Sequence, residues 1–557
     1  MTAQWVSHVA DAYRRGMVHA DTLWYHGPYA AQFVQTGRLT GLLDRSDTVH
    51  TFGAMNSELV HALLILPFHR DVLSPLVNLG WAALAMLAAW CIGRRHGVGP
   101  LAVLGVAVVL GLPTVAGTHP GQASNDVMAG SLVLTCVALL LESDLQPLPV
   151  ALAALSGGLA LGTKLTIALP VAFLAVSVLI LALRQRRRAT AAWWSLLLAL
   201  SGCYWFARNI SLVHNPVPWF RLSVGPIHLT RVASSGGATI AGRLTDSHAW
   251  SSFIVSGLHT ALGPAWPVVV AVPIVGAAVV VYVRRDARLE QIAGATVLVA
   301  SLGYLITPGT AHAGGLSFVF NLRYLAPALL LGYAVWPSAL TRSTHQAWAA
   351  GALLALVVID ATAPDYERVP AWPTSSLVFG AIAGVLVLLV VFRPHVPPLS
   401  VPARASLVAA LVAVVFAAGW LLQRSYLEHR YLQAGLNGDE INSVFRSIRG
   451  ARVGVDGTIE VYPYYGLDLS NHVATVEAIA GAHASACETW QALVSEHYEY
   501  VVTTRFGFAL VNRLPPSWFV APVATLVRRS GQTELHRLHG LVPAVCSPAP
   551  EVGHSAP

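Results

Sequence analysis

The sequence predicts a mainly α-helical membrane protein with about twelve transmembrane helices and a small extracytoplasmic α/β domain at its C-terminus. Three observations predict this fold class. Hydrophobic residues make up 55% of the 557 residues and charged residues only 11%, whereas a soluble protein carries about a quarter. Apolar runs alternate with short arginine clusters, and the chemistry of the chain changes after about residue 421. We expect an extracytoplasmic first loop at 1–70, a multi-span domain at 71–421 and the C-terminal domain at 422–557.

The formal net charge of +7 raises the question of a nucleic-acid partner. The basic residues lie in short clusters between apolar runs, which is typical of the cytoplasmic loops of membrane proteins. We therefore interpret the charge as a sign of topology and expect the lipid bilayer, and no nucleic acid, as a partner.

The transmembrane helices follow from runs of about 20 mostly apolar residues, or fewer where neighbouring helices shelter them. The runs that fit are 72–93, 99–117, 127–142, 149–162, 164–183, 190–208, 264–283, 290–306, 325–340, 347–361, 375–392 and 405–421. The two runs beside Lys164 are short enough to form one re-entrant pair instead.

Arginine clusters set the orientation of these helices. Arg94–Arg95, 184–188, 284–288 and Arg393 fall at alternate loops, so all can be cytoplasmic at once. The opposite loops then face outward from the plasma membrane. They are 1–70, 118–126, about 210–262, 307–324, 362–374 and everything after about 422. Long outer segments with acids, aromatics and histidines are where we expect chemistry.

The N-terminus does not fit this orientation easily, because residues 1–20 contain no apolar run. Trp5, Val6, Val9 and Ala10 fit at most an amphipathic surface helix. Either the N-terminus is translocated without help, or a first transmembrane helix lies upstream of Met1. We expect the missing helix.

The C-terminal segment has the pattern of an α/β domain. Strands are predicted at 451–457, 498–504 and 523–531, and helices at 441–450 and 486–497. Cys487 and Cys546 both lie there, where an oxidising compartment allows a disulfide between them. The aromatic segment 461–471 fits either a lid over the membrane domain or an ordinary strand–loop with packed tyrosines, and we favour the second.

The first candidate site lies in the first outer loop, where Asp21 is followed by Trp24, Tyr25 and His26. A carboxylate in a partly dry aromatic pocket suits a general base, because burial raises its pKa. Aromatic rings offer flat apolar faces to sugar rings. The alternative is an interfacial loop with an aromatic belt and a helix-capping Asp21.

The second candidate is Asp126, which directly precedes a predicted helix and either caps it or carries function. Lys164 is the only charged residue in a stretch of more than thirty. An unpaired ammonium at membrane depth costs roughly 3 kcal/mol, so an anion should meet it. We expect this anion to be either Asp126 or the phosphate of a lipid-linked substrate.

Arg208 and Arg323 lie at the outer ends of predicted helices, and Tyr324 follows the second of them. A guanidinium group can donate two hydrogen bonds to phosphate oxygens, so both arginines are candidate phosphate-binding residues. The other interpretation is that they anchor the helix ends at the membrane interface. Glu58 lies near His50, His61 and His69, but this spacing matches no standard metal site. We predict no metal ligands.

The order and sidedness of several short segments resemble the GT-C superfamily, and more closely the bacterial protein-mannosyltransferase and aminoarabinose-transferase type of membrane glycosyltransferase. The segments are D-T-L-W-Y-H-G-P-Y-A-A-Q-F-V-Q-T-G (21–37), G-T-K-L-T (162–166), Y-W-F-A-R-N (204–209), N-P-V-P-W-F (215–220) and N-L-R-Y (321–324). This chain departs from the pattern at Thr22, where many relatives have a second acid, and at A-M-N-S-E-L (54–59), where they have a basic residue and paired prolines.

The resemblance implies a GT-C fold and an inverting transfer of a hexose or pentose from a polyprenyl-phosphate donor on the extracytoplasmic face. Asp21 would be the catalytic base for the acceptor hydroxyl, and Asp126 would help to position acceptor or donor. Lys164, Arg208 and Arg323 would bind the donor phosphate, and Trp24, Tyr25, His26 and Tyr324 would bind substrate.

Two other functions remain open. A transporter or flippase of lipid-linked saccharides should show internal repeats and broken helices, and no convincing repeat is present. A non-enzymatic assembly partner would not need Asp21 and Asp126 near one cavity. Neither a P-loop nor a glycine-rich fingerprint is present, which fits a lipid-phosphate leaving group. We expect a glycan, lipid or protein acceptor in the cell envelope and no certain cofactor, although some relatives use a divalent cation.

Overall fold

The computed structural model describes residues 1–40, 48–233, 237–311, 315–340, 342–362, 401–432, 439–458, 460–481, 483–504 and 513–546. The chain folds into two compact units. Unit 1 comprises Met1–Tyr13, Phe52–Val60 and Leu73–Leu422, and unit 2 comprises Arg14–Thr51, His61–Val72 and Gln423–Pro557.

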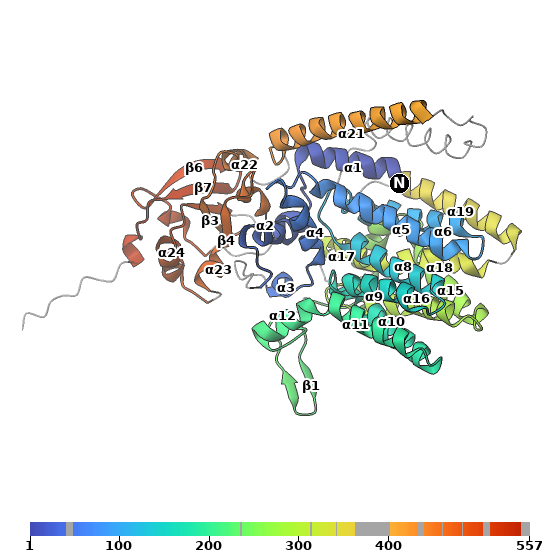
Figure 1. The fold of residues 1–557 in the computed structure, drawn as a ribbon. Helices are drawn as coiled ribbons and strands as arrows, with labels where there is room; N and C mark the ends of the chain where they lie inside the picture. Colours follow the sequence, from blue (N-terminus) through green and yellow to red (C-terminus); the bar gives the residue numbers. More distant parts are fainter. Residues whose placement is uncertain are drawn as a thin grey trace, which may run out of the picture. The chain divides into compact units, whose positions relative to one another are not determined.

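Unit 1 is built from helices (Figure 1). Up to the first long outer loop they are α1 (Thr2–Arg15), α4 (Asn56–Ile65), α5 (Val77–Arg94), α6 (Gly99–Gly111), α7 (Pro113–Ala116), α8 (Asp126–Glu142), α9 (Pro147–Leu161), α10 (Ala168–Arg184), α11 (Arg188–Gly202) and α12 (Tyr204–Val213). A short hairpin, β1 (Leu222–Val224) and β2 (Ile227–Leu229), follows. The remaining helices are α13 (Ser247–Ala249), α14 (Val255–Leu262), α15 (Trp266–Val283), α16 (Arg288–Ile306), α17 (Gly315–Asn321), α18 (Ala326–Val335), α19 (Ser343–Thr362) and α21 (Val401–His429).

Within the described residues, five helical stretches are long and apolar enough to cross a membrane. They are Ser74–Arg94, Leu165–Arg184, Trp266–Val283, Arg288–Ile306 and Phe318–Ala339. Helices α11 and α12 make a sixth if they are one span, although they bend by 55° at their junction. The predicted run 375–392 lies outside the described residues, and the total of about twelve spans stays a prediction.

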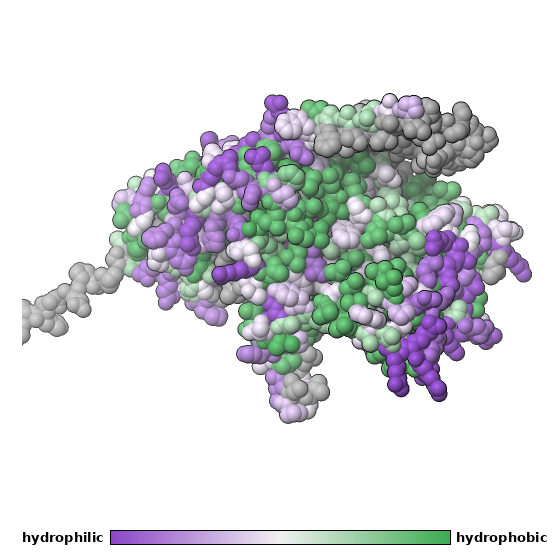
Figure 2. Space-filling model, in the orientation of Figure 1, coloured by the Kyte–Doolittle hydropathy of each residue, from purple (hydrophilic) through white to green (hydrophobic). Residues whose placement is uncertain are grey.

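Helices α8 and α18 form the centre of unit 1. All ten residues of α18 are buried, and Val127, Leu134 and Cys136 of α8 have no exposed surface. The outer helices instead expose large apolar side chains, such as Val275 (60%) and Leu302 (55%), as expected of surfaces that face lipid. Figure 2 shows hydrophilic residues gathered where α10 ends and α11 begins, at the arginine run 184–188.

Small residues allow α9 and α11 to pack closely. A β-carbon added to Gly202 would lie 3.1 Å from the α-carbon of Gly158, and one added to Gly158 would lie 2.0 Å from Ser201 Oγ. Such contacts between glycines are a common way to join transmembrane helices.

Helix α1 confirms the expected amphipathic character of the N-terminal residues. Trp5 and Val9 are buried, whereas Val6 and Ala10 are only partly covered. The Trp5 indole donates a hydrogen bond to the Leu110 carbonyl of α6 over 2.7 Å, so this helix packs against the helical bundle through its apolar side.

Unit 2 combines first-loop helices with a five-stranded sheet. The helices are α2 (Gly27–Thr36), α3 (Thr48–Thr51), α22 (Asp439–Phe445), α23 (Val476–Ala480) and α24 (Ala486–Ser495), and the strands are β3 (Arg452–Asp456), β4 (His472–Thr475), β5 (Tyr500–Thr504), β6 (Ala524–Ser530) and β7 (Thr533–Leu538). The strand order is β4-β3-β5-β7-β6. Strands β4, β3 and β5 are parallel, whereas β7 and β6 are antiparallel to their neighbours.

Three of these strands and the helices α22 and α24 were predicted within a few residues, and β4, β7 and α23 were not. Trp490 and Leu493 of α24 pack in the apolar core beside Val501 of the sheet. Gly454 of β3 lets α24 approach, because a β-carbon there would lie 2.9 Å from Leu493.

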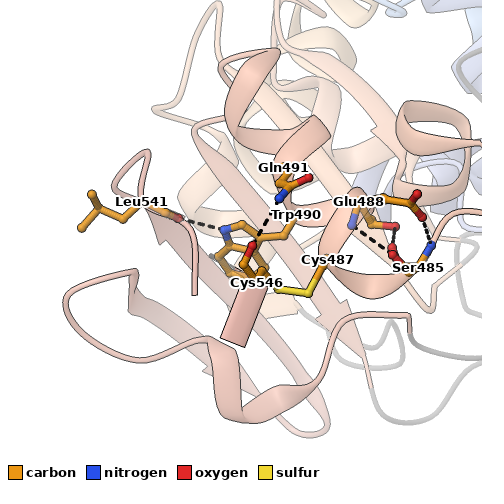
Figure 3. The surroundings of a disulfide bond; sticks show 8 residues. Ser485, Cys487, Glu488, Trp490, Gln491, Leu541 and Cys546 are labelled. Carbon is orange, nitrogen blue, oxygen red and sulfur yellow. Dashed lines mark hydrogen bonds between the residues drawn. A yellow bond between two sulfur atoms is a disulfide. The ribbon is translucent and has the colours of Figure 1, made fainter. Parts of the chain in front are cut away.

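A disulfide joins Cys487 of α24 to Cys546, with 5.3 Å between their α-carbons. The disulfide that the sequence left open is therefore present in the structure. Figure 3 shows that the Trp490 indole donates to the Leu541 carbonyl (2.9 Å) and the Gln491 amide to the Cys546 carbonyl (3.3 Å). The disulfide and these hydrogen bonds hold the segment from Leu541 to Cys546 against α24.

Candidate functional site

The strongest polar cluster of unit 1 surrounds Asp126, the first residue of α8. Asp126 is 1% exposed. Lys164 Nζ donates to its Oδ1 over 2.5 Å and to Asn125 Oδ1 over 3.1 Å. Of the two anions predicted for Lys164, the structure therefore contains the first, Asp126.

Two more basic side chains reach the same carboxylate. Arg323 Nε lies 3.6 Å from Asp126 Oδ2, and His119 Nε2 lies 3.3 Å from the same oxygen. Burial lowers the pKa of His119 below its usual value, so its imidazole is neutral near pH 7. Two cations, Lys164 and Arg323, therefore contact the Asp126 carboxylate, one at each oxygen.

Aromatic rings complete this cluster. Lys164 Nζ lies 4.4 Å from the centroid of the Tyr324 ring. The Arg323 guanidinium lies 4.0 Å from the Phe320 ring and 5.6 Å from the Tyr324 ring. Cation–π contacts of this kind stabilise charges removed from water. Tyr324, a predicted substrate-binding residue, therefore contacts both cations of the cluster.

The backbone around Asp126 is fixed by a single asparagine. The Asn78 amide of α5 donates to the carbonyls of His119, Gln122 and Ser124, over 3.0, 2.9 and 3.0 Å. These bonds pair the backbone carbonyl groups of a buried loop, where unpaired carbonyls are costly. They hold the loop so that His119 and Asp126 meet.

Arg208 of α12 packs against the segment that precedes α4. Its Nη2 donates to the Gly53 carbonyl over 3.5 Å and to Asn209 Oδ1 over 3.0 Å. Its guanidinium also stacks 4.8 Å from the Trp205 ring, and the residue is only 4% exposed. An arginine so deeply held does not behave as a snorkelling anchor.

Asn56 connects the segment beside Arg208 with the loop that carries Lys164. Asn56 Oδ1 accepts from the Trp205 indole (2.9 Å), and its amide donates to the Leu159 carbonyl (3.1 Å). Its backbone N–H donates to the Gly162 carbonyl over 2.9 Å. Asn56 therefore ties the supports of two predicted phosphate-binding residues together. Sequence reasoning singled out this stretch only as a departure from the family pattern.

Asp21 belongs to unit 2 and directly precedes a π-helical turn, Thr22–His26. It is 5% exposed, and the Tyr25 hydroxyl donates to its Oδ2 over 2.8 Å. The predicted capping role is absent, because the Asp21 side chain makes no cap hydrogen bond. π-Helical turns are rare in proteins overall, and many of those that occur lie at functional sites.

The predicted substrate-binding aromatics of the first loop stack together around His50. The Tyr25 ring lies 3.9 Å from the His50 ring and nearly parallel to it, and the Trp24 ring meets His50 edge-on at 4.7 Å. The His26 ring lies 4.1 Å from Tyr25. Trp24 and Tyr25 are half-buried, so part of each side chain remains exposed.

A second buried acid of unit 2, Asp71, was missed by sequence reasoning. It accepts hydrogen bonds from Arg430, from the Tyr426 hydroxyl (2.8 Å) and from the Tyr462 hydroxyl (2.9 Å). Burial, together with the Asp71 carboxylate, raises the pKa of Tyr462 well above its usual value, so its hydroxyl stays protonated and donates. The partners are 355 or more residues away in sequence, so no local pattern could have identified them.

The aromatic segment 461–471 forms part of this buried structure. Tyr462, Tyr464 and Tyr465 are at most 2% exposed, and the Gln32 amide donates to the Tyr465 hydroxyl over 3.3 Å. The favoured interpretation, a loop with packed tyrosines, agrees with this burial.

Glu58 and the nearby histidines do not assemble into a metal site within the described residues, where no three metal-binding side chains gather. No protein-family model matches the sequence, and neither does any curated protein.

Solved structures do match. The chain superposes on the crystal structure of ArnT from Cupriavidus metallidurans in the apo state with a TM-score of 0.52 and 14% sequence identity, over 98% of each chain. The chain has the fold of ArnT. A second ArnT structure, bound to undecaprenyl phosphate, matches with a TM-score of 0.50, 14% identity and 98% of each chain.

ArnT is an aminoarabinose transferase of the GT-C superfamily, so the predicted resemblance is confirmed at the level of the fold. With its long apolar helices, the ArnT-like chain is a multi-pass membrane protein.

Proposed function

We propose that this chain is a glycosyltransferase that moves a sugar, with inversion, from a polyprenyl-phosphate donor to an acceptor hydroxyl on the extracytoplasmic face of the plasma membrane. The observation that carries the proposal is the pair of cationic side chains, Lys164 and Arg323, gathered around the buried Asp126 carboxylate. Ammonium and guanidinium groups held close together match the oxygens of a phosphate.

A lipid phosphate fits this cluster better than a soluble nucleotide does. The basic residues lie at the ends of apolar helices, where the headgroup of a membrane lipid would lie. ArnT, whose fold the chain shares, is known with undecaprenyl phosphate bound. We propose that Lys164, Arg323 and Arg208 bind the donor phosphate and stabilise the negative charge that develops on it as it leaves.

Asp21 is proposed as the general base. The acceptor oxygen attacks the anomeric carbon, its proton passes to the Asp21 carboxylate, and the bond from the anomeric carbon to the phosphate oxygen breaks. Polyprenyl phosphate leaves with the bonding electrons. The burial of Asp21 and its bond from Tyr25 fix the direction of the carboxylate. The half-buried Trp24 and Tyr25 offer a stacking surface for a sugar.

For Asp126 we keep the positioning role that the resemblance implied and narrow it to the donor. A carboxylate held by Lys164, Arg323 and His119 is a poor proton acceptor, because each positive neighbour favours its ionised form. We propose that Asp126 positions the two cations for the donor phosphate.

The test uses the full chain reconstituted in liposomes with a panel of polyprenyl-phosphate sugars and an envelope extract as the acceptor. The proposal predicts free polyprenyl phosphate and labelled acceptor in equal amounts. A flippase would instead move the intact donor to the other leaflet and release no polyprenyl phosphate. If every donor in the panel reached the other leaflet intact and no polyprenyl phosphate was released, the transferase would be excluded.

A further inference from the structure

A second polar cavity lies in unit 1 at the other end of α8, about 22 Å from Asp126 by the rise of 1.5 Å per residue. Its volume is about 310 Å³, and it opens where α5, α8, α10 and α16 end or begin. The arginine clusters predicted to be cytoplasmic surround this end of the bundle. The cavity is therefore separate from the proposed transferase site.

One side of the cavity favours an anion. Arg95 and Arg288 both line it. Arg95 Nη2 contacts Asp144 only at 4.0 Å, which leaves most of its five donors available for another acceptor. Helix α16 also begins here, and its N-cap residue, Ala287, offers no side-chain cap. The positive end of that helix therefore adds to the two guanidinium groups.

Two acidic residues of the lining favour a cation. The carboxylates of Asp144 and Asp286 line the cavity, and the Asp144 side chain is 82% exposed. A third acid, Glu290, is engaged by His96 Nε2 at 3.1 Å and by Arg284 Nε at 3.4 Å. Glu290 therefore adds little repulsion toward an anion, and the two aspartates are left to attract an ammonium group.

The floor of the cavity is apolar. Leu141 of α8, Leu181 of α10 and Leu289 of α16 all line it. A cavity lined by both signs of charge and by leucines matches an amphiphile whose head carries both charges. Pockets between transmembrane helices at this depth commonly bind lipid headgroups.

We propose that this cavity binds the headgroup of a phospholipid with a primary amine, of the phosphatidylethanolamine class. Its phosphate lies at Arg95, Arg288 and the first turn of α16, and its ammonium donates to Asp144 and Asp286. Phosphatidylcholine has no N–H groups to donate, and phosphatidylglycerol has no positive charge, so both bind less well.

The experiment is native mass spectrometry of the full chain titrated with phosphatidylethanolamine, phosphatidylcholine or phosphatidylglycerol of identical acyl chains. The wild type should reach half-saturation with phosphatidylethanolamine at a concentration about 10-fold lower than with either other lipid, as one lost charge-assisted bond predicts. Equal binding of the three lipids, or a preference for phosphatidylglycerol, would overturn the proposal.

Two double variants separate the two ends of the headgroup. Arg95→Gln with Arg288→Gln should weaken all three lipids, whereas Asp144→Asn with Asp286→Asn should lower phosphatidylethanolamine to the level of phosphatidylcholine. The matched control is Arg285→Gln, because Arg285 is exposed and adjacent but does not line the cavity. Thermal melting checks that each double variant is folded. If one is not, the corresponding single variants replace it. Retention of the preference in folded Asp144 and Asp286 variants would also contradict the proposal.

Discussion

Lys164 donates a hydrogen bond to Asp126 over 2.5 Å, between a loop after α9 and the first residue of α8. With Arg323 3.6 Å from the other carboxylate oxygen, this pair is the centre of the account. The pair places the lone lysine of an apolar stretch beside an anion. It also brings a second cation, Arg323, to the same carboxylate.

The first prediction concerns the stability of this cluster. Asp126→Asn leaves Lys164 and Arg323 buried against a neutral amide, which should lower the free energy of unfolding by about 3–5 kcal/mol. Lys164→Met should cost less, because Arg323 still pairs with Asp126. Thermal melting in detergent measures both variants.

Glu142→Gln is the matched control for Asp126→Asn, because Glu142 ends the same helix and pairs with Arg94 at 3.2 Å on an exposed surface. It should cost less than about 1 kcal/mol. Similar losses at Asp126 and Glu142 would refute the claim that the buried Asp126 carboxylate holds the two cations.

The second prediction concerns Asn56 as the connection between the supports of Arg208 and Lys164. A β-carbon at Gly162 would lie 2.4 Å from Asn56 Nδ2, so Gly162→Ala must displace an amide that Trp205 also holds. We expect a loss of about 1–3 kcal/mol in stability and weaker binding of undecaprenyl phosphate. Gly80→Ala is the control, since a β-carbon there meets no atom within 4 Å. Unchanged lipid binding in Gly162→Ala would disprove the coupling.

The third prediction concerns the buried network of unit 2. Asp71→Asn leaves Arg430 without its carboxylate at a site where both side chains are at most 3% exposed, so unfolding should become easier by about 3–5 kcal/mol. Limited proteolysis of the full chain should then cleave unit 2 faster. Asp468→Asn breaks the more exposed pair with Arg449 and should have little effect. Equal protection of Asp71→Asn and wild type would contradict this assignment.

The fourth prediction concerns pH. Burial raises the pKa of Asp456 at the end of β3 to about 6, although the N–H groups of Arg513 and Leu514 donate to it and oppose the shift. The unfolded value is about 3.9, so the folded state binds the proton more tightly. The stabilisation is complete below pH 4 and is lost as pH rises through 6, by up to about 3 kcal/mol.

Hydrogen exchange of the β3 and β5 amides in the full-length protein between pH 4.5 and 8, corrected for intrinsic rates, measures this effect. Protection should fall with rising pH in the wild type, and Asp456→Asn should abolish that trend. Protection that rises with pH would show that the two backbone donors, rather than burial, decide the pKa.

Much of the fold followed from local sequence patterns. Apolar runs predicted the long helices, and an isolated lysine at membrane depth predicted an anion that the structure identifies as Asp126. Strands β3 and β5 were predictable because valine and threonine recur in R-V-G-V-D and Y-V-V-T-T, and β6 because T-L-V leads into a turn at S-G-Q. Strand β4 has only four residues, which is too short to stand out in the sequence. Strand β7 reads T-E-L-H-R-L, which is too charged to be recognised without its neighbours in the sheet.

The rest depended on contacts between distant parts of the chain. Asp71 sits beside a predicted span boundary, and its significance appears only with Arg430, 359 residues later. Asn56 is equally inconspicuous, because an asparagine in a loop predicts a turn rather than a connection between Trp205 and Gly162. The π-helical turn after Asp21 arises from backbone geometry that no residue pattern specifies.

The central claim is that Asp21 acts as the base in sugar transfer, and the rate of transfer by Asp21→Asn tests it most directly. Asparagine preserves the size of the side chain and removes only its ability to accept the proton. With wild type and Asp468→Asn as references, and with folding checked by melting, the account predicts a loss of about 10²–10⁴-fold in rate from a polyprenyl-phosphate sugar. A folded Asp21→Asn protein that transfers sugar at the wild-type rate would contradict it.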